Sequence, residues 1–221
     1  VKEFNDLTCL GHMDMLRIGI SGHINLDPQQ IDKLEQAVDE VLNFVEQKFP
    51  EHYLTVFSPL AVGADRLVAR QLLEREAARL IAVLPIAQNE YINDFGQSDD
   101  YRIDPQGAAL RQEFKYWLSE RAIEIIAMSI SPTRRAAYLK AGYFIAENSD
   151  ILIVVWDGQN HQNRSVTAQI VDRAEKLNKP IFHIWADNYK SVSSRTNIEV
   201  KPGEIRYKNF LAQTPGEWQS M

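Results

Sequence analysis

The chain has 221 residues, enough for one sizeable domain or at most two small ones, and 45% of them are hydrophobic and 24% charged. Its 24 Lys and Arg against 30 Asp and Glu give a net charge of -6, so we expect no general nucleic-acid binding and no binding to a membrane, although a local pocket could hold a small anion. The single cysteine, Cys9, excludes an intrachain disulfide framework and a cysteine-rich zinc site, and it is typical of a reducing, cytoplasmic setting.

The first expected strand covers residues 16–21, and a helix follows it after a short loop. Asp27 can cap that helix, Pro28 suits its first position, and Gln30 stands where a capping box has its second member. The next apolar residues recur every three or four positions and predict one buried helix face: Ile31, Leu34, Val38, Val41, Leu42 and Val45.

Two further strands, over residues 53–57 and 80–84, are each followed by a connection of a different kind. A helical pattern separates the two strands. Residues 86–106, in contrast, are polar and interrupted by glycine and proline, which predicts a lid or a variable insertion.

The alternation of strands and helices continues in the second half of the chain. We expect a helix over residues 107–121 and strands over residues 123–128, 151–156 and 181–185. The strand over residues 151–156 is apolar on both faces, as a central parallel strand should be. Two further helices are marked by their apolar residues: Ala137, Ala141, Phe144 and Ile145, then Val166, Ile170, Val171, Ala174 and Leu177.

This order of elements predicts an α/β fold: a single Rossmann-like three-layer domain with a mainly parallel sheet of about six strands. We place the domain at residues 15–186, after an N-terminal extension (residues 1–14) and before an irregular C-terminal tail (residues 187–221). Such sheets bind ligands beyond the carboxyl ends of their strands, near the point where the strand order reverses. The loops that follow the strands are therefore the candidate ligand site.

The loop after the first strand, Gly19-Ile-Ser-Gly22-His23, comes close to three known signatures and matches none. Ser21 replaces the middle glycine of the dinucleotide fingerprint, and His23 replaces the last glycine of a nucleophile elbow. No P-loop motif occurs, so a dehydrogenase, an ATPase and an α/β-hydrolase are all disfavoured. The remaining possibilities are that backbone N–H groups of Ser21, Gly22 and His23 approach an anion, or that Gly22 merely forms a tight turn.

The loop after the second strand begins at Ser58 and reaches a helix at Gly63, Ala64 and Asp65. The small side chains would leave the helix N-terminus uncovered, so its N–H groups and positive dipole end could meet a phosphate. Asp65 could instead be an ordinary first-turn acid that stabilises the dipole. The spacing of these residues alone favours the second interpretation.

A third polar loop follows the strand over residues 151–156. Asp157 could accept hydrogen bonds from a sugar or a base, while Ser165 and Thr167 could donate to a phosphate. The alternative is that Asp157-Gly158 is an ordinary turn and Ser165 an ordinary helix cap.

The remaining polar residues do not suggest a metal or a cofactor. No two of the five histidines have metal-ligand spacing on one element, so we expect neither. Arg134 and Arg135 could pair with an anionic ligand, but we expect at least one of them to be a surface charge.

Taken together, these loops resemble the SLOG superfamily, the Rossmann-like group that contains the DNA-processing protein A family, the Lonely-guy-type nucleotide phosphoribohydrolases and related bacterial ligand-sensor domains. The resemblance spans roughly residues 16–185. It rests on Arg17-Ile-Gly-Ile-Ser-Gly-His23, Ser58-Pro-Leu-Ala-Val-Gly-Ala-Asp-Arg-Leu-Val68, Val83-Leu-Pro85, Glu90-Tyr91, Asp94-Phe95, Glu113-Phe114 and Ser149-Asp-Ile-Leu-Ile-Val-Val-Trp-Asp-Gly158. It implies a nucleotide-derived ligand lined by Gly22, Gly63, Ala64, Asp65, Asp157, Gly158 and Thr167.

One departure from the family pattern bears on catalysis. The phosphoribohydrolases carry Pro-Gly-Gly-x-Gly-Thr-x-x-Glu after a late strand, whereas residues 163–169 here read Asn-Arg-Ser-Val-Thr-Ala-Gln. Thr167 matches the threonine of that motif, but the paired glycines and the glutamate are absent. The side chain of Arg164 would restrict the approach of the backbone to a phosphate. The departure therefore favours binding over turnover.

We accordingly carry three hypotheses. The first is the binding or sensing of a nucleotide or nucleotide-derived ligand without turnover, at the carboxyl edge of the sheet. The second is a nucleotide N-glycoside hydrolase, in which Glu113 and Asp157, with Glu90 as a further candidate, would stabilise an oxocarbenium-like state. The third is a protein-interaction domain without a small ligand. Self-association into a homo-oligomer would support this third hypothesis.

Overall fold

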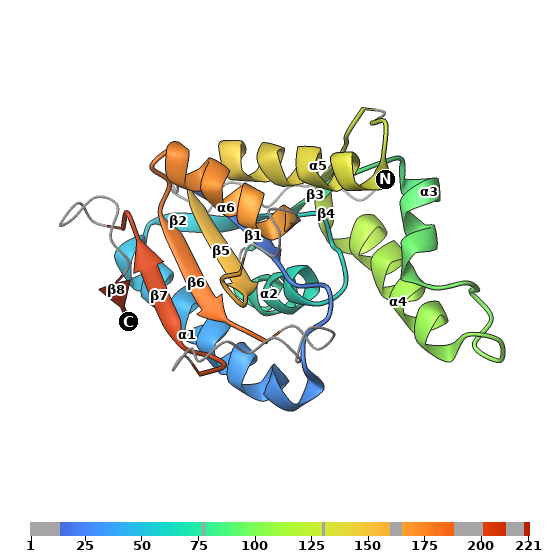
Figure 1. Ribbon diagram of the computed structural model, residues 1–221, viewed down its shortest axis with the longest axis horizontal. Coiled ribbons are helices and arrows are strands. Elements are labelled where there is room, and N and C mark those ends of the chain that lie inside the picture. The colour runs from blue at the N-terminus through green and yellow to red at the C-terminus, as the bar shows by residue number, and fades with distance from the viewer. Residues whose placement is uncertain (1–13, 77, 130, 160–164, 188–200, 211–218) are drawn as a thin grey trace, which may run out of the picture.

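An eight-stranded sheet runs through the molecule in the order β4-β3-β2-β1-β5-β6-β7-β8 (Figure 1). The structure is a computed structural model, and it describes residues 14–76, 78–129, 131–159, 165–187, 201–210 and 219–221. The strands are β1 Asp14–Gly22, β2 His52–Ser58, β3 Arg79–Leu84, β4 Ala122–Ala127, β5 Ile151–Trp156, β6 Ile181–Trp185, β7 Ile205–Lys208 and β8 Gln219–Ser220.

The strands β1 to β6 are all parallel to one another, which confirms the α/β, Rossmann-like fold. The expected number of about six strands is too low, because β7 and β8 add two antiparallel strands to the β6 edge. These strands lie in the polar segment after residue 186. A ladder of two to four residues rests on backbone hydrogen bonds, so it needs no hydrophobic alternation that a sequence pattern could reveal.

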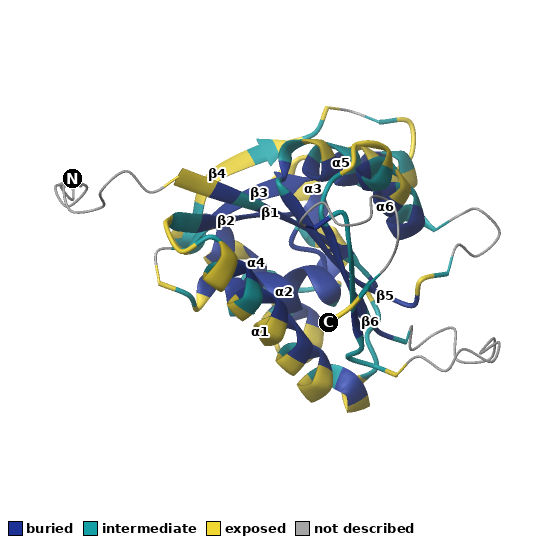
Figure 2. Ribbon diagram, turned by 90° about the vertical axis from the view of Figure 1, so that its left-hand side faces the viewer, coloured by how far each residue is buried: buried dark blue, intermediate teal, exposed yellow. Residues whose placement is uncertain are grey.

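Helices cover both faces of the sheet and make two separate cores. The helices are α1 Ile31–Lys48, α2 Ala64–Leu73, α3 Gln88–Tyr91, α4 Pro105–Tyr116, α5 Arg134–Asn148 and α6 Val166–Lys176, with short helical turns η1 Pro28–Gln30, η2 Ile92–Phe95 and η3 Trp117–Arg121. Buried side chains of α1, α2 and α4 pack on one face, and those of α5 and α6 pack on the other. Figure 2 shows the central strands buried and β4 exposed at the sheet edge.

The helix starts follow the capping residues in the sequence. Asp27 accepts a hydrogen bond from the backbone N–H of Gln29, and Thr133 and Ser165 likewise cap α5 and α6. Gln30 departs from the capping-box prediction, because its side-chain amide donates to the carboxylate of Asp27 and to that of Asp187. The α1 helix is therefore preceded by a short turn that also joins the β1–α1 loop to the end of β6.

The polar segment after β3 packs against α4 through a few aromatic anchors. Tyr91 and Phe95 are almost fully buried, and both pack on the ring of Phe114 of α4, Tyr91 edge-on and Phe95 tilted. Asp104 caps α4 by accepting from the N–H of Gly107, so the helix begins at Pro105 rather than at residue 107. The predicted lid or insertion is thus anchored to the core at one end.

Two expectations reach beyond the described part of the chain. Residues 1–13 of the expected extension and Arg164 lie outside it. Among the helices that are described, none combines the length and the apolar character that crossing a lipid bilayer requires.

Candidate functional site

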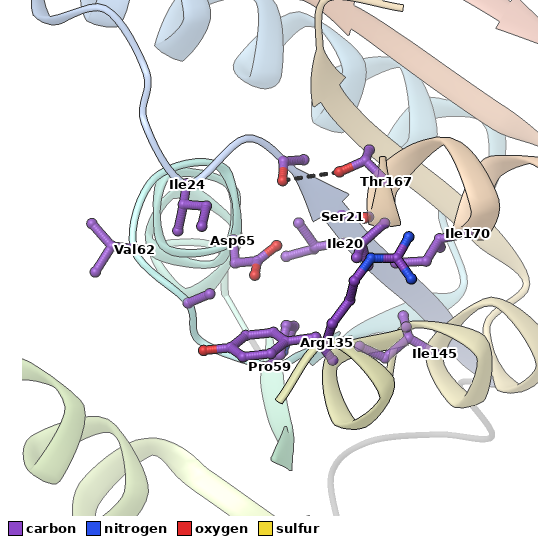
Figure 3. A pocket seen from close by; sticks show the side chains of 15 residues that line it. Ile20, Ser21, Ile24, Pro59, Val62, Asp65, Arg135, Ile145, Thr167 and Ile170 are labelled. Carbon is purple, nitrogen blue, oxygen red and sulfur yellow. Dashed lines mark hydrogen bonds between the residues drawn. The ribbon is translucent and has the colours of Figure 1, made fainter. Parts of the chain in front are cut away.

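A cavity of about 300 Å³ opens beside the carboxyl end of β1, next to the point where the strand order reverses between β1 and β5 (Figure 3). This volume lies at the lower end of the about 300–1,000 Å³ typical of small-molecule sites. The cavity is enclosed by β1, the loop after β2, α2, α5 and α6. Its lining is Ile20, Ser21, Gly22, Ile24, Pro59, Ala61, Val62, Asp65, Arg135, Tyr138, Gly142, Ile145, Val166, Thr167 and Ile170.

The inner wall of the cavity is apolar, and its acidic and basic side chains, Asp65 and Arg135, differ in how far they are buried. Ile20, Ile145 and Ile170 are buried, and they point into the pocket from three different elements. Asp65 is buried as well, whereas Arg135 is exposed at the mouth of the cavity, and Ile24, also in the lining, is 59% exposed. The arrangement suits a ligand with a flat or apolar part inside and an anionic part outside.

Thr167 joins the first turn of α6 to the end of β1. Its hydroxyl donates to the carbonyl oxygen of Gly22 at 3.2 Å, the bond that is dashed in Figure 3. The Thr167 oxygen can still accept a hydrogen bond from a ligand. Ser165 is an N-cap, as its alternative interpretation predicted, since its hydroxyl accepts from the N–H of Ala168.

The glycines of the first two loops allow these loops to touch each other. A Cβ on Gly22 would lie 2.5 Å from the Cβ of Ala64 and still closer to the carbonyl oxygen of Val155. Gly63 has a φ of 85°, and a Cβ there would lie 2.6 Å from the carbonyl oxygen of Ile24. Close packing of β1 against the start of α2 therefore requires both glycines.

The first N–H group of α2 has a protein partner. The backbone N–H of Ala64 donates to the carbonyl oxygen of His23 at 2.9 Å. The N-terminus of α2, which the sequence predicts as a possible phosphate site, is thus partly occupied by a carbonyl oxygen of the neighbouring loop. Asp65, which occupies the next position, adds a carboxyl group at the same helix end.

His23 and Asp157 form a buried pair between the ends of β1 and β5. The backbone N–H of Asp157 donates to the His23 Nε2 atom at 3.0 Å. The Oδ1 atom of Asp157 lies 3.3 Å from the same nitrogen and accepts the N–H of Gln159. His183 of β6 lies nearby, and burial lowers its pKa.

Ser58 and Gly158 shape the turns that follow β2 and β5. The Ser58 hydroxyl is fully buried and accepts the N–H of Leu60, whose φ is positive at 58°. Gly158 also has a positive φ, and it packs next to Trp185. Ser58 and Gly158 thus stabilise the conformation of the loops in which they lie.

Glu113 lies on α4, where it binds two arginines of α2. Its carboxylate oxygens are 2.6 Å from Arg66 Nη1 and 2.7 Å from Arg70 Nη2. Arg66 is only 3% exposed, and its guanidinium group lies over the ring of Phe95 at 4.5 Å. The side chain of Glu113 thus holds the aromatic segment against α2.

Asp65 is the acidic residue among the described side chains that line the cavity. Its Oδ1 atom is buried and has no hydrogen-bond partner among the described residues. Burial raises the pKa of this carboxyl group to about 8, while a backbone hydrogen bond involving Ala61 and the charge of Arg66 act in the opposite direction. Near neutral pH the group is therefore largely protonated, so it has both an O–H donor and a carbonyl acceptor.

The predicted ligand residues divide into two sets. Ser21, Gly22, Asp65 and Thr167 line the cavity, whereas the other predicted residues do not: His23, Ser58, Gly63, Ala64, Asp157 and Gly158. The two candidate catalytic residues, Glu113 and Asp157, are both outside the lining. Within the described parts of the chain no group of three His, Cys, Asp or Glu side chains is placed to hold a metal ion.

Several lining residues were not singled out as site residues from the sequence. Arg135 lies in the first turn of α5, in the segment after β4 that the strand-end rule selected, but its charge alone did not separate it from Arg134, which pairs with Asp94. Ile145 and Ile170 follow the apolar helix periodicity, so the sequence pattern assigns them to the core. No local signal distinguishes a cavity wall from a filled core.

Comparison with known proteins identifies a related fold. No family model and no curated protein matched the chain. Among solved structures the chain is similar to DNA processing protein A from Helicobacter pylori, with 16% identity over 77% of this chain and 65% of that one, at a TM-score of 0.46. The likeness concerns the Rossmann-like fold, and the chain spans about two thirds of the length of that protein.

The same comparison overturns one expectation. The acidic net charge led us to expect no general nucleic-acid binding, but the similar structure is described for its single-stranded DNA binding mode. A net charge is a sum over the whole surface, and it does not fix the field at any one patch. The exclusion of nucleic acid is therefore withdrawn.

Proposed function

We propose that the protein binds a nucleotide or nucleotide-derived ligand in the cavity beside the end of β1, without turnover. The proposal includes that the chain belongs to the ligand-sensing branch of the SLOG superfamily. The observation that carries it is the cavity itself, which combines apolar walls, a buried carboxyl group at Asp65 and a cation at its mouth, Arg135. Its position at the strand-order reversal is where open α/β sheets bind ligands.

The position of the carboxylates favours binding over N-glycoside cleavage. A hydrolase of this kind needs a carboxylate beside the glycosidic bond. Glu113 is engaged by Arg66 and Arg70, and Asp157 is engaged by the N–H of Gln159. Neither of them lines the cavity, so we put binding first.

The test is isothermal calorimetry with a panel of nucleosides, nucleoside monophosphates and a short single-stranded oligodeoxynucleotide. The variant Ile24→Trp places a large ring at the mouth, and Ile123→Trp on β4 is its control, because the two isoleucines are 59% and 60% exposed and only Ile24 lines the cavity. We expect at least one nucleoside or nucleotide to bind the wild type and the Ile123→Trp variant, and to bind Ile24→Trp at least about tenfold more weakly. Absence of binding by the wild type, or equal binding by both variants, would contradict the proposal.

A further inference from the structure

Asp65 has a polar atom that the described protein does not satisfy. Its side chain is 7% exposed, and its carboxyl group points into the cavity (Figure 3). The Oδ1 atom has no hydrogen-bond partner among the described residues. A buried polar atom in this state costs about 1–3 kcal/mol, so its natural explanation is a partner that enters with a ligand.

The charged side chains near Asp65 on α2 and α4, Arg66 and Glu113, form hydrogen bonds with other partners. The guanidinium group of Arg66 donates to the carbonyl oxygens of Leu60 and Leu110 and to the carboxylate of Glu113. No hydrogen bond or ion pair between Asp65 and Arg66 is present in the described structure. Arg66 therefore acts on Asp65 only through its field.

The groups that face Asp65 from the other elements are neutral near pH 7, apart from one arginine. The buried hydroxyl group of Tyr91 of α3 lies next to that of Tyr138, and burial raises the pKa of Tyr91. Tyr138 of α5 donates to the carboxylate of Asp94 at 2.6 Å. Ser21 of β1 and Thr167 of α6 contribute hydroxyl groups, and the cation in the lining is Arg135, at the exposed mouth.

We propose that Asp65 recognises the Watson–Crick edge of a nucleobase in which a ring-nitrogen acceptor lies beside an exocyclic amino donor, so that the base enters first and the phosphate stays at the mouth near Arg135. This inference rests on the proposed function and names the part of the ligand that the cavity reads. Adenine and cytosine have such an edge, with a ring nitrogen as acceptor next to an exocyclic amino group. A carboxyl group can donate its O–H to the ring nitrogen and accept from the amino group.

The inner end of the cavity is unsuited to a phosphate. Its walls are apolar, the first N–H of α2 is bonded to His23, and the hydroxyl cap of α6 is Ser165. A phosphate at Asp65 would also meet the negative end of the carboxyl dipole. The exposed guanidinium group of Arg135 is the better partner for it.

The first arm of the test asks what Asp65 provides. Adenosine affinity is measured by calorimetry for the wild type, Asp65→Asn, Asp65→Leu and the control Asp150→Asn, whose carboxyl group lies at the amino end of β5, away from the carboxyl ends of the strands. At about pH 6.5, where the carboxyl group is neutral, Asp65→Asn retains a donor and an acceptor, so its affinity stays within about threefold of the wild type. Asp65→Leu fills the same space without either, and it binds at least about tenfold more weakly.

The second arm changes pH and the ligand. Ionisation removes the O–H donor, so the wild type binds adenosine more weakly at about pH 9.5 than at about pH 6.5, whereas Asp65→Asn does not change. Arg135→Gln weakens the binding of adenosine monophosphate and leaves that of adenosine unchanged. Thermal denaturation shows that each variant is folded.

The outcomes separate this inference from the proposed function. Binding that Ile24→Trp weakens and that Asp65→Leu does not change would keep the proposed function and overturn the role of Asp65. The role is also overturned if Asp65→Asn loses as much affinity as Asp65→Leu, if affinity rises with pH, or if guanosine binds more tightly than adenosine. If no nucleoside or nucleotide binds the wild type, the proposed function itself fails.

Discussion

The substitution Glu113→Gln separates a structural role of Glu113 from a catalytic one. It removes the charge that pairs with the buried guanidinium group of Arg66, while the amide can still accept one neutral hydrogen bond. A hydrogen bond to a charged group contributes about 1.5–3 kcal/mol, and the second partner, Arg70, is half exposed and adds little. We therefore expect the free energy of unfolding to fall by about 2 kcal/mol and Tm by about 4–8 °C.

Urea denaturation and differential scanning calorimetry measure this loss, with Glu147→Gln as the matched control. Glu147 pairs with Arg173 at the same distance of 2.6 Å, but both partners are about 40% exposed. Surface pairs contribute little, so the control should cost about 0.5 kcal/mol or less. Equal losses in the two variants would refute the reasoning. Loss of base release from a nucleoside monophosphate in Glu113→Gln, with stability unchanged, would restore the hydrolase hypothesis.

Three further predictions concern other parts of the molecule. Gly22→Ala pushes a methyl group against Ala64 and should lower the free energy of unfolding by about 1–3 kcal/mol, measured in urea; an unchanged midpoint would contradict the packing argument. The folded protein holds a proton on Asp65 up to about pH 8, whereas the unfolded chain releases it near 3.8, so the wild type should lose stability relative to Asp65→Asn as pH rises through this interval; a constant difference would show that the group is not perturbed. The pKa of Asp150 is lowered, with hydrogen bonds from Arg17 among the causes that offset its burial, so Asp150→Asn should cost up to about 1 kcal/mol at about pH 7, and this cost should shrink as pH falls below the unfolded value of 3.8; a cost that grows towards acid pH would contradict this.

The parallel part of the fold could be predicted because each strand and helix has a strong local pattern. The strand over residues 151–156 is apolar throughout and lies at the centre of the sheet, and the helix that starts near Asp27 keeps its apolar residues on one face. In contrast, β7 and β8 are short edge strands that pair through backbone atoms. Nothing in their side chains separates them from the polar residues around them.

The candidate site could be located from the sequence, but its composition could not. The strand-end rule selected the segments after β1, β2, β3, β4 and β5. Ser21, Asp65 and Thr167 from these segments line the cavity, whereas the segment after β3 contributes no lining residue. The apolar walls come from Ile145 and Ile170, whose helical spacing is that of core residues. Whether such residues meet in a filled core or around a cavity depends on distances between elements that are far apart in the sequence.

The central claim is that a nucleoside or nucleotide enters the cavity beside β1, and the direct measurement is a titration followed by the NMR signals of isoleucine methyl groups. The chain carries reporters at the cavity, Ile20, Ile145 and Ile170, and remote ones on β4, Ile123 and Ile125. With adenosine monophosphate, the account predicts saturable shifts at the cavity methyl groups and none on β4. Shifts on β4 alone, or no shift at any of these methyl groups, would contradict it.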